Sequence, residues 1–95
     1  MYIHKSVYDW DRDKARRNFE KHGVSFLEAV GAFEDPLGLD AADEAHSWRE
    51  TRRLRIAKTR GGRVLVVSYT LRGTVVRIIS ARLASRMERA RYAEA

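Results

Sequence analysis

Three apolar segments separated by glycine turns constrain the fold most strongly. Residues 53–59 alternate basic and apolar side chains, residues 63–71 contain the run VLVVSY, and residues 74–80 contain VVRII. Gly61-Gly62 and Arg72-Gly73 separate these segments, and glycine allows the backbone angles that tight hairpin turns require. The sequence therefore predicts three consecutive strands in an antiparallel meander, with a buried central strand.

A strand and a helix are expected at the start of the chain. Residues 1–8 alternate in a way that predicts a short first strand. The segment WDRDKARRNFEKHG, residues 10–23, predicts a helix with Asp9 or Asp11 as its N-cap. Gly23 stands where a helix end commonly needs a left-handed residue, so this helix is expected to stop there.

Two more helices complete the predicted order. Ser25 and Glu28 form a capping-box pattern that begins a second helix, which is expected to run to residue 33. Residues 34–48 contain five acidic and no basic residues and are expected to form a loop. A final helix is expected to start at residue 80 or 81 and to run to about residue 92. The chain is thus predicted to be one α+β domain over residues 1–95, in the order β-α-α-β-β-β-α, with one sheet face covered by helices.

Charge is divided unevenly along the chain. Residues 1–48 contain six basic and ten acidic residues, whereas residues 49–95 contain thirteen basic and three acidic ones. Twelve of those thirteen are arginine, whose planar guanidinium binds phosphate through two hydrogen bonds. The second half therefore indicates a polyanionic partner, most simply nucleic acid. The alternative is a solvated surface that keeps a small protein soluble.

Several classes of protein are excluded. The chain has no cysteine, which rules out disulfides, thiol catalysis and cysteine-ligated zinc. Ninety-five residues are too few for a dinucleotide-binding or barrel enzyme. Histidines and carboxylates do not occur at metal-ligand spacing, so we expect no metal and no other cofactor. No membrane-spanning run or secretory signal is present, so we expect a cytoplasmic protein that does not contact membranes.

Two motifs carry a resemblance to a known family. KHGVSF occupies residues 21–26 and RIISAR occupies residues 77–82. Either motif alone is weak evidence for a family, but Trp10-Asp11 precedes them and Asp35-Pro36 lies between them. In this combination the sequence resembles the BrnT toxin family over residues 8–92.

The resemblance implies a RelE-like fold, with helices packed on a small antiparallel sheet. It also implies the toxin of a type II toxin–antitoxin pair: an RNA endonuclease that needs no metal and inhibits translation and growth. The implied partners are an RNA substrate and a BrnA-like ribbon-helix-helix antitoxin. A heterotetramer of the two proteins would bind operator DNA. A non-catalytic module that binds nucleic acid or a protein partner remains the alternative, because net charge and arginines would serve it equally well.

Arginines are the candidates for binding the scissile phosphate. Metal-free RNA cleavage needs a base for the 2′-hydroxyl, an acid for the 5′-oxygen and cations for the charge that develops on phosphorus. Arg77 interrupts an apolar strand, and Arg55 and Arg63 are expected to share its sheet face. We expect Arg77, Arg63 and Arg82 to bind the phosphate, with Arg82 in the first turn of the last helix. The alternative for Arg77 and Arg82 is a structural ion pair with an acid, which for Arg77 would come from a helix.

Three residues are candidates for moving protons. His22 lies at a helix end, where it either exchanges protons or satisfies the terminal carbonyls. Lys21 either binds phosphate or is a solvated surface lysine. His46 either forms an acid–base pair with Glu50 or is an ordinary loop histidine. Trp48, in the same loop, is a candidate for contact with a partner.

Overall fold

The computed structural model describes residues 8–94. In chain order its elements are β1 (Tyr8–Trp10), α1 (Arg12–His22), α2 (Phe26–Gly31), the 3₁₀ helix η2 (Ala32–Glu34), β2 (Leu39–Ala42), the 3₁₀ helix η3 (Glu44–His46), β3 (Arg52–Lys58), β4 (Val64–Arg72), β5 (Val75–Leu83) and α3 (Arg86–Glu94).

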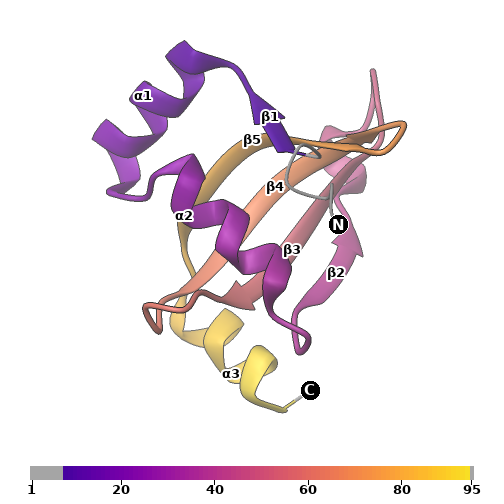
Figure 1. Ribbon diagram of the computed structural model, residues 1–95. Helices are drawn as coiled ribbons and strands as arrows, with labels where there is room; N and C mark the ends of the chain where they lie inside the picture. Colours follow the sequence, from indigo (N-terminus) through magenta and orange to yellow (C-terminus); the bar gives the residue numbers. More distant parts are fainter. Residues whose placement is uncertain (1–7, 95) are drawn as a thin grey trace, which may run out of the picture.

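The strands form one five-stranded sheet in the order β1-β5-β4-β3-β2 (Figure 1). Strands β2 to β5 pair antiparallel, and β1 runs parallel to β5. Both α1 and α2 pack on β5 and bury one face of the sheet. The core lies between these layers and consists of Val24, Phe26, Ala29, Ala32, Ala57, Leu65, Val67, Ile78 and Ala81. The predicted α+β class and the meander are confirmed.

The segment predicted to be a loop contains an edge strand. Within residues 34–48, β2 pairs with β3 in a register that places Leu39 opposite Ile56 and Asp40 opposite Arg55. The prediction of a loop throughout is therefore wrong, because a cross-strand ion pair compensates for the acidic composition. At the other edge of the sheet, the strand predicted over residues 1–8 overlaps β1 only at its last residue. Residues 1–7 lie outside the described residues.

The last strand is longer and the last helix starts later than predicted. Pairing with β4 continues through Arg82 and Leu83, so Arg82 lies in β5 and not in a helix. The helix α3 begins only after Ser85, which forms a capping box with Glu88. The Glu88 amide donates to Ser85 Oγ at 3.2 Å, and the Ser85 amide donates to Glu88 Oε1 at 2.7 Å.

The first two helices begin at the predicted caps. Asp11 accepts a hydrogen bond from the Lys14 amide, and Ser25 accepts one from the Glu28 amide, each at 2.9 Å. Glu28 was also expected to bond back to the start of its own helix. Instead its carboxylate binds Arg63, so the second half of that capping box is wrong.

Asn18 binds the edge of β5 beyond the end of β1. Strand β1 pairs with residues 76–78, and Ala81 lies farther along the same edge. The Ala81 amide donates to Asn18 Oδ1 at 3.1 Å, and Asn18 Nδ2 donates to the carbonyls of Ala81 at 2.8 Å and Val24 at 3.0 Å. Asn18 is only 7% exposed, so one buried side chain replaces a neighbouring strand at this point and joins α1 to the sheet.

We expect Gly23→Val to lower the free energy of unfolding by about 1 kcal/mol or more. Gly23 ends α1 with φ 69°, and its amide donates to the Phe19 carbonyl at 2.8 Å. Apart from Gly23 and its chain neighbours, none of the residues the structure describes comes within 4 Å of the position of a Cβ there, so the cost comes from the left-handed backbone. Chemical denaturation measures the change. Gly23→Asn should lose less, and a valine variant as stable as the unaltered chain would contradict this assignment.

Candidate functional site

The register of the sheet separates the arginines onto two faces. Tyr69 packs against Phe33 on the helix-covered face, so its neighbour Thr70 points to the opposite face. Thr70 pairs with Arg52 on one side and with Arg77 on the other, and paired residues share a face. We call this surface, turned away from α1 and α2, the outer face.

Arg55 and Arg63 lie on the helix side of the sheet. Arg55 pairs with Val67 of the core, and its guanidinium donates to the carbonyls of Ala32 at 2.8 Å and Asp35 at 2.6 Å. Because side chains alternate along a strand, Arg55 cannot share a face with its neighbours at 52 and 54. The expectation that Arg55 and Arg63 share the face of Arg77 is therefore wrong.

Arg63 is held by α2. Its Nε and one terminal nitrogen donate to Glu28 at 2.9 and 2.7 Å, and the same terminal nitrogen donates to the Gly23 carbonyl at 3.0 Å. These hydrogen bonds from Arg63 lower the pKa of Glu28 and raise the pKa of Arg63 itself. Lys21 and His22 lie in the last turn of α1, next to Gly23. These three predicted site residues thus belong to one end of α1.

A hollow of about 320 Å³ lies on the outer face, between η3 and strands β3, β4 and β5. It is lined by Asp43, His46, Arg52, Leu54, Ser68, Ile79, Ser80 and Arg82. Two of the predicted site residues, His46 and Arg82, therefore meet here although they are 36 positions apart in the sequence. We call this feature the outer-face hollow.

His46 is oriented by Asp43. Its Nδ1 lies 3.0 Å from Asp43 Oδ2 and 3.1 Å from Oδ1, and a carboxylate can only accept, so Nδ1 donates. Asp43 is mostly covered, whereas the imidazole is 64% exposed, which leaves Nε2 available for proton exchange. The prediction that Glu50 is the partner of His46 is wrong, since Glu50 forms an ion pair with Arg72 at 3.2 Å.

Two arginines line the hollow: Arg82 forms the ion pair with an acid that the alternative interpretation described, whereas Arg52, among the described residues, does not. Arg82 donates to both oxygens of Glu88, at 2.8 and 3.0 Å, and these hydrogen bonds raise its pKa. No ion pair within residues 8–94 involves Arg52, so its charge is uncompensated. Arg52 was not among the predicted site residues. The available signal was its two-residue spacing from Leu54, which places both side chains on one face.

Arg77 lies on the outer face but outside the hollow. Thr70 separates it from Arg52, and its guanidinium pairs with Asp9 at 3.3 Å. An acid does pair with Arg77, as the alternative interpretation held, but it comes from β1 and not from a helix. The six predicted site residues therefore divide into an outer-face group and a group at the end of α1.

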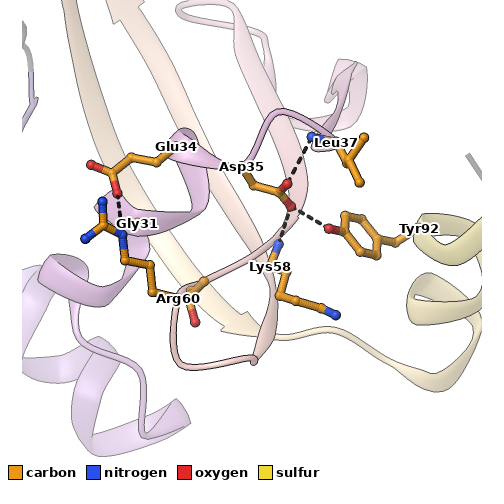
Figure 2. A pocket seen from close by; sticks show the side chains of 8 residues that line it. Gly31, Glu34, Asp35, Leu37, Lys58, Arg60 and Tyr92 are labelled. Atoms are coloured by element: carbon orange, nitrogen blue, oxygen red, sulfur yellow. Dashed lines mark hydrogen bonds and ion pairs between the residues drawn. The ribbon is translucent and has the colours of Figure 1, made fainter.

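A second hollow, of about 360 Å³, is lined by residues whose contacts stabilise the fold (Figure 2). At its centre, Asp35 accepts hydrogen bonds from the amides of Leu37 at 2.9 Å and Lys58 at 2.8 Å, and from the Tyr92 hydroxyl at 2.6 Å. Burial alone would raise the pKa of Asp35, but these hydrogen bonds outweigh it and lower the pKa. Through these hydrogen bonds Asp35 joins α3, at Tyr92, to the end of β3, at Lys58.

We expect the stability of the protein to fall as the pH drops from about 4.5 towards 2. The hydrogen bonds from Arg82 lower the pKa of Glu88 to about 2, from an ordinary value of 4.5. Glu88 therefore stabilises the fold fully above pH 4.5 and loses this effect as it is protonated near pH 2. Because solvent screens this partly exposed pair, the expected contribution is about 1–2 kcal/mol.

Thermal unfolding between pH 2 and 6, compared with Glu88→Gln, measures this contribution. The variant should be less stable above pH 4.5 and should show a flatter pH dependence. Parallel curves for the two proteins would contradict the assignment.

Comparison with known proteins decides the family. The family described as "Ribonuclease toxin, BrnT, of type II toxin-antitoxin system" matches residues 10–88. The chain belongs to the BrnT family. This BrnT-family protein is thus a ribonuclease toxin of a type II toxin–antitoxin system, and RNA and an antitoxin are its partners.

The BrnT fold is also seen in a solved structure. The crystal structure of the Brucella abortus ribonuclease toxin BrnT superposes with a TM-score of 0.66 at 22% sequence identity, over 85% of this chain and all of the other. At 22% identity, this similarity is evidence for the fold of the chain alone. No curated protein matches the chain. Between residues 8 and 94, no helix is long and apolar enough to cross a membrane, and no three His, Asp or Glu side chains gather as metal ligands would.

Proposed function

We propose that this BrnT-family toxin cleaves RNA in the outer-face hollow, without a metal ion. The observation that carries the proposal is that the Asp43–His46 pair, Arg52 and Arg82 all line one hollow. A base oriented by a carboxylate, next to cations, is the combination that transesterification of RNA requires.

The reaction uses the RNA's own 2′-hydroxyl as nucleophile. His46 Nε2 accepts the proton of this hydroxyl while its oxygen bonds to the adjacent phosphorus. Arg52 and Arg82 stabilise the negative charge that accumulates on the phosphoryl oxygens. The bond to the 5′-oxygen breaks, and this oxygen takes a proton from water. The products are a 2′,3′-cyclic phosphate and a 5′-hydroxyl end.

The two arginines have different parts in this proposal. Arg52 has no ion pair among the described residues, so it provides the net charge that attracts phosphate. Arg82 is fixed by two hydrogen bonds from its guanidinium to Glu88, so it provides a donor of defined orientation. Arg77 lies on the same face and extends the basic surface along the RNA backbone.

Incubation of the purified protein with an RNA oligonucleotide in EDTA tests the proposal. We expect fragments with 2′,3′-cyclic phosphate ends, identified by mass spectrometry. The matched DNA oligonucleotide lacks the nucleophile and should stay intact. RNA that binds but remains uncut would refute catalysis in favour of the alternative, a non-catalytic binding module.

For the antitoxin, we propose a BrnA-like ribbon-helix-helix protein that forms a heterotetramer with the toxin and carries it to operator DNA. Membership of the BrnT family supports this assignment. The complex would act in the cytoplasm, where release of the toxin inhibits translation and growth. Light scattering of the co-purified pair should give the mass of two toxins with two antitoxins, and a 1:1 mass would contradict the heterotetramer.

A further inference from the structure

Trp48 follows His46 by two residues in the chain, and 78% of its surface is exposed. It lies between His46 and Arg52, which both line the hollow. Two residues span at most about 7 Å of chain, so the indole ring is within reach of a group attached to a phosphate bound there. Exposure alone would not distinguish Trp48 from other exposed apolar side chains, and three further features of the loop do so.

The first feature is that the loop around Trp48 is anchored at both ends. On one side, the Ser47 hydroxyl donates to the Asp43 carbonyl at 2.6 Å and accepts from the Arg52 amide at 2.9 Å. On the other side, the Thr70 hydroxyl donates to the Thr51 carbonyl at 2.6 Å. Trp48 is therefore presented on a fixed turn, so that ordering it on ligand binding costs little entropy.

The second feature is that the indole ring has one face covered by a cation. The guanidinium carbon of Arg49 lies 4.6 Å from the centroid of the Trp48 ring, which is a cation–π contact. This contact leaves the opposite face of the ring for another planar group.

The third feature is the charge around the ring. No ion pair within residues 8–94 involves Arg49 or Arg52, and Glu50 is paired with Arg72, so these two arginines outnumber Asp43, the one acid among the residues that line the hollow. The surroundings of the ring therefore favour an anion. A flat ring beside uncompensated arginines fits a ligand in which planar bases alternate with phosphates, and unpaired nucleotides present their bases for such stacking.

We propose that Trp48 is a stacking platform for an unpaired nucleobase next to the cleaved phosphodiester. The substrate class of the hollow is accordingly single-stranded RNA. This inference rests on the proposed function, because it takes the hollow as the place where the phosphate binds. Stacked bases in a duplex have no free face for the indole, so paired RNA gains nothing from Trp48.

The test measures binding separately from cleavage. The probe is a single-stranded RNA oligonucleotide with 2′-O-methyl groups, which has no free 2′-hydroxyl and cannot be cut by the proposed reaction. We expect Trp48→Ala to raise its Kd by about 10-fold or more, as is typical for the loss of one base–aromatic stack. Trp48→Phe should recover most of the affinity. Leu27→Ala removes a side chain that is 75% exposed on α2 and is the matched control, with unchanged Kd.

Two results would overturn the inference. One is a Kd for RNA that does not discriminate as expected: Trp48→Ala leaves the Kd for the single-stranded probe unchanged, or raises the Kd for a duplex of the same sequence by the same factor. The other is a variant that keeps its RNA affinity but loses antitoxin binding, which would make Trp48 a protein contact. If the unaltered protein binds the probe through Trp48 yet leaves ordinary RNA uncut, the proposed function fails while the stacking platform stands.

Discussion

Replacing His46 by alanine is expected to lower kcat for RNA cleavage by about 100- to 10,000-fold, the usual effect of losing a general base. The imidazole in the outer-face hollow is both oriented and solvent-accessible, since Nδ1 is bonded to Asp43 and the side chain is mostly exposed. Initial rates on a labelled oligonucleotide at saturating concentration measure the loss. Because His46 is exposed, the variant should unfold at the same temperature as the unaltered protein.

Two companion variants make this result decisive. Asp43→Asn keeps the size of the side chain but removes the carboxylate that accepts the hydrogen bond from Nδ1 and orients the ring, so we expect a smaller loss than for His46→Ala. His22→Ala changes the histidine at the end of α1, on the other side of the sheet, and should retain cleavage. A large loss in His22→Ala with none in His46→Ala would move the reaction to that end of α1, where Lys21 and Arg63 also lie.

Asn18→Leu is expected to lower the free energy of unfolding by about 2–4 kcal/mol. The amide makes three hydrogen bonds to the backbone of Val24 and Ala81, and leucine would leave these buried groups without partners. The change is large for a domain of this size, whose total stability is about 5–15 kcal/mol. Urea denaturation followed by circular dichroism measures it.

Asn18→Asp provides a second measure of the same contacts. The carboxylate has nearly the same shape, but it would face two carbonyl oxygens as an acceptor and should also destabilise. Arg17→Leu introduces the same leucine at the neighbouring exposed position of α1 and should change stability by no more than about 0.5 kcal/mol. A loss below that value in Asn18→Leu would show that the amide is not the link between α1 and the sheet.

Local signals in the sequence predicted much of the fold. The glycine turns at 61–62 and 73 and the apolar runs beside them were sufficient for the meander, because hairpins depend on adjacent residues. Asp11 and Ser25 were found as caps for the same reason. Strand β2 was not predicted, because it depends on the pairing of Asp40 with Arg55, a contact 15 positions apart in the sequence.

The site was predicted less well than the fold, for two physical reasons. A shared face requires the strand register, and a register irregularity between Ser68 and Tyr69 cannot be read from one strand alone. The predicted partner of His46 was Glu50, four positions later in the chain. Residues 44–46 form a 3₁₀ turn, in which side chains three positions apart lie above one another, so Asp43 is the partner.

Glu88 couples the last helix to the outer-face hollow. Its carboxylate accepts hydrogen bonds from the Arg82 guanidinium and from the amide of Ser85, the residue before α3. A protease that cut the chain at Ser85 would remove α3 together with Glu88, the ion-pair partner of Arg82. Such a cut would lie outside the sheet, because β5 ends at Leu83. Loss of α3 would therefore leave Arg82 without the carboxylate that fixes its orientation beside the hollow.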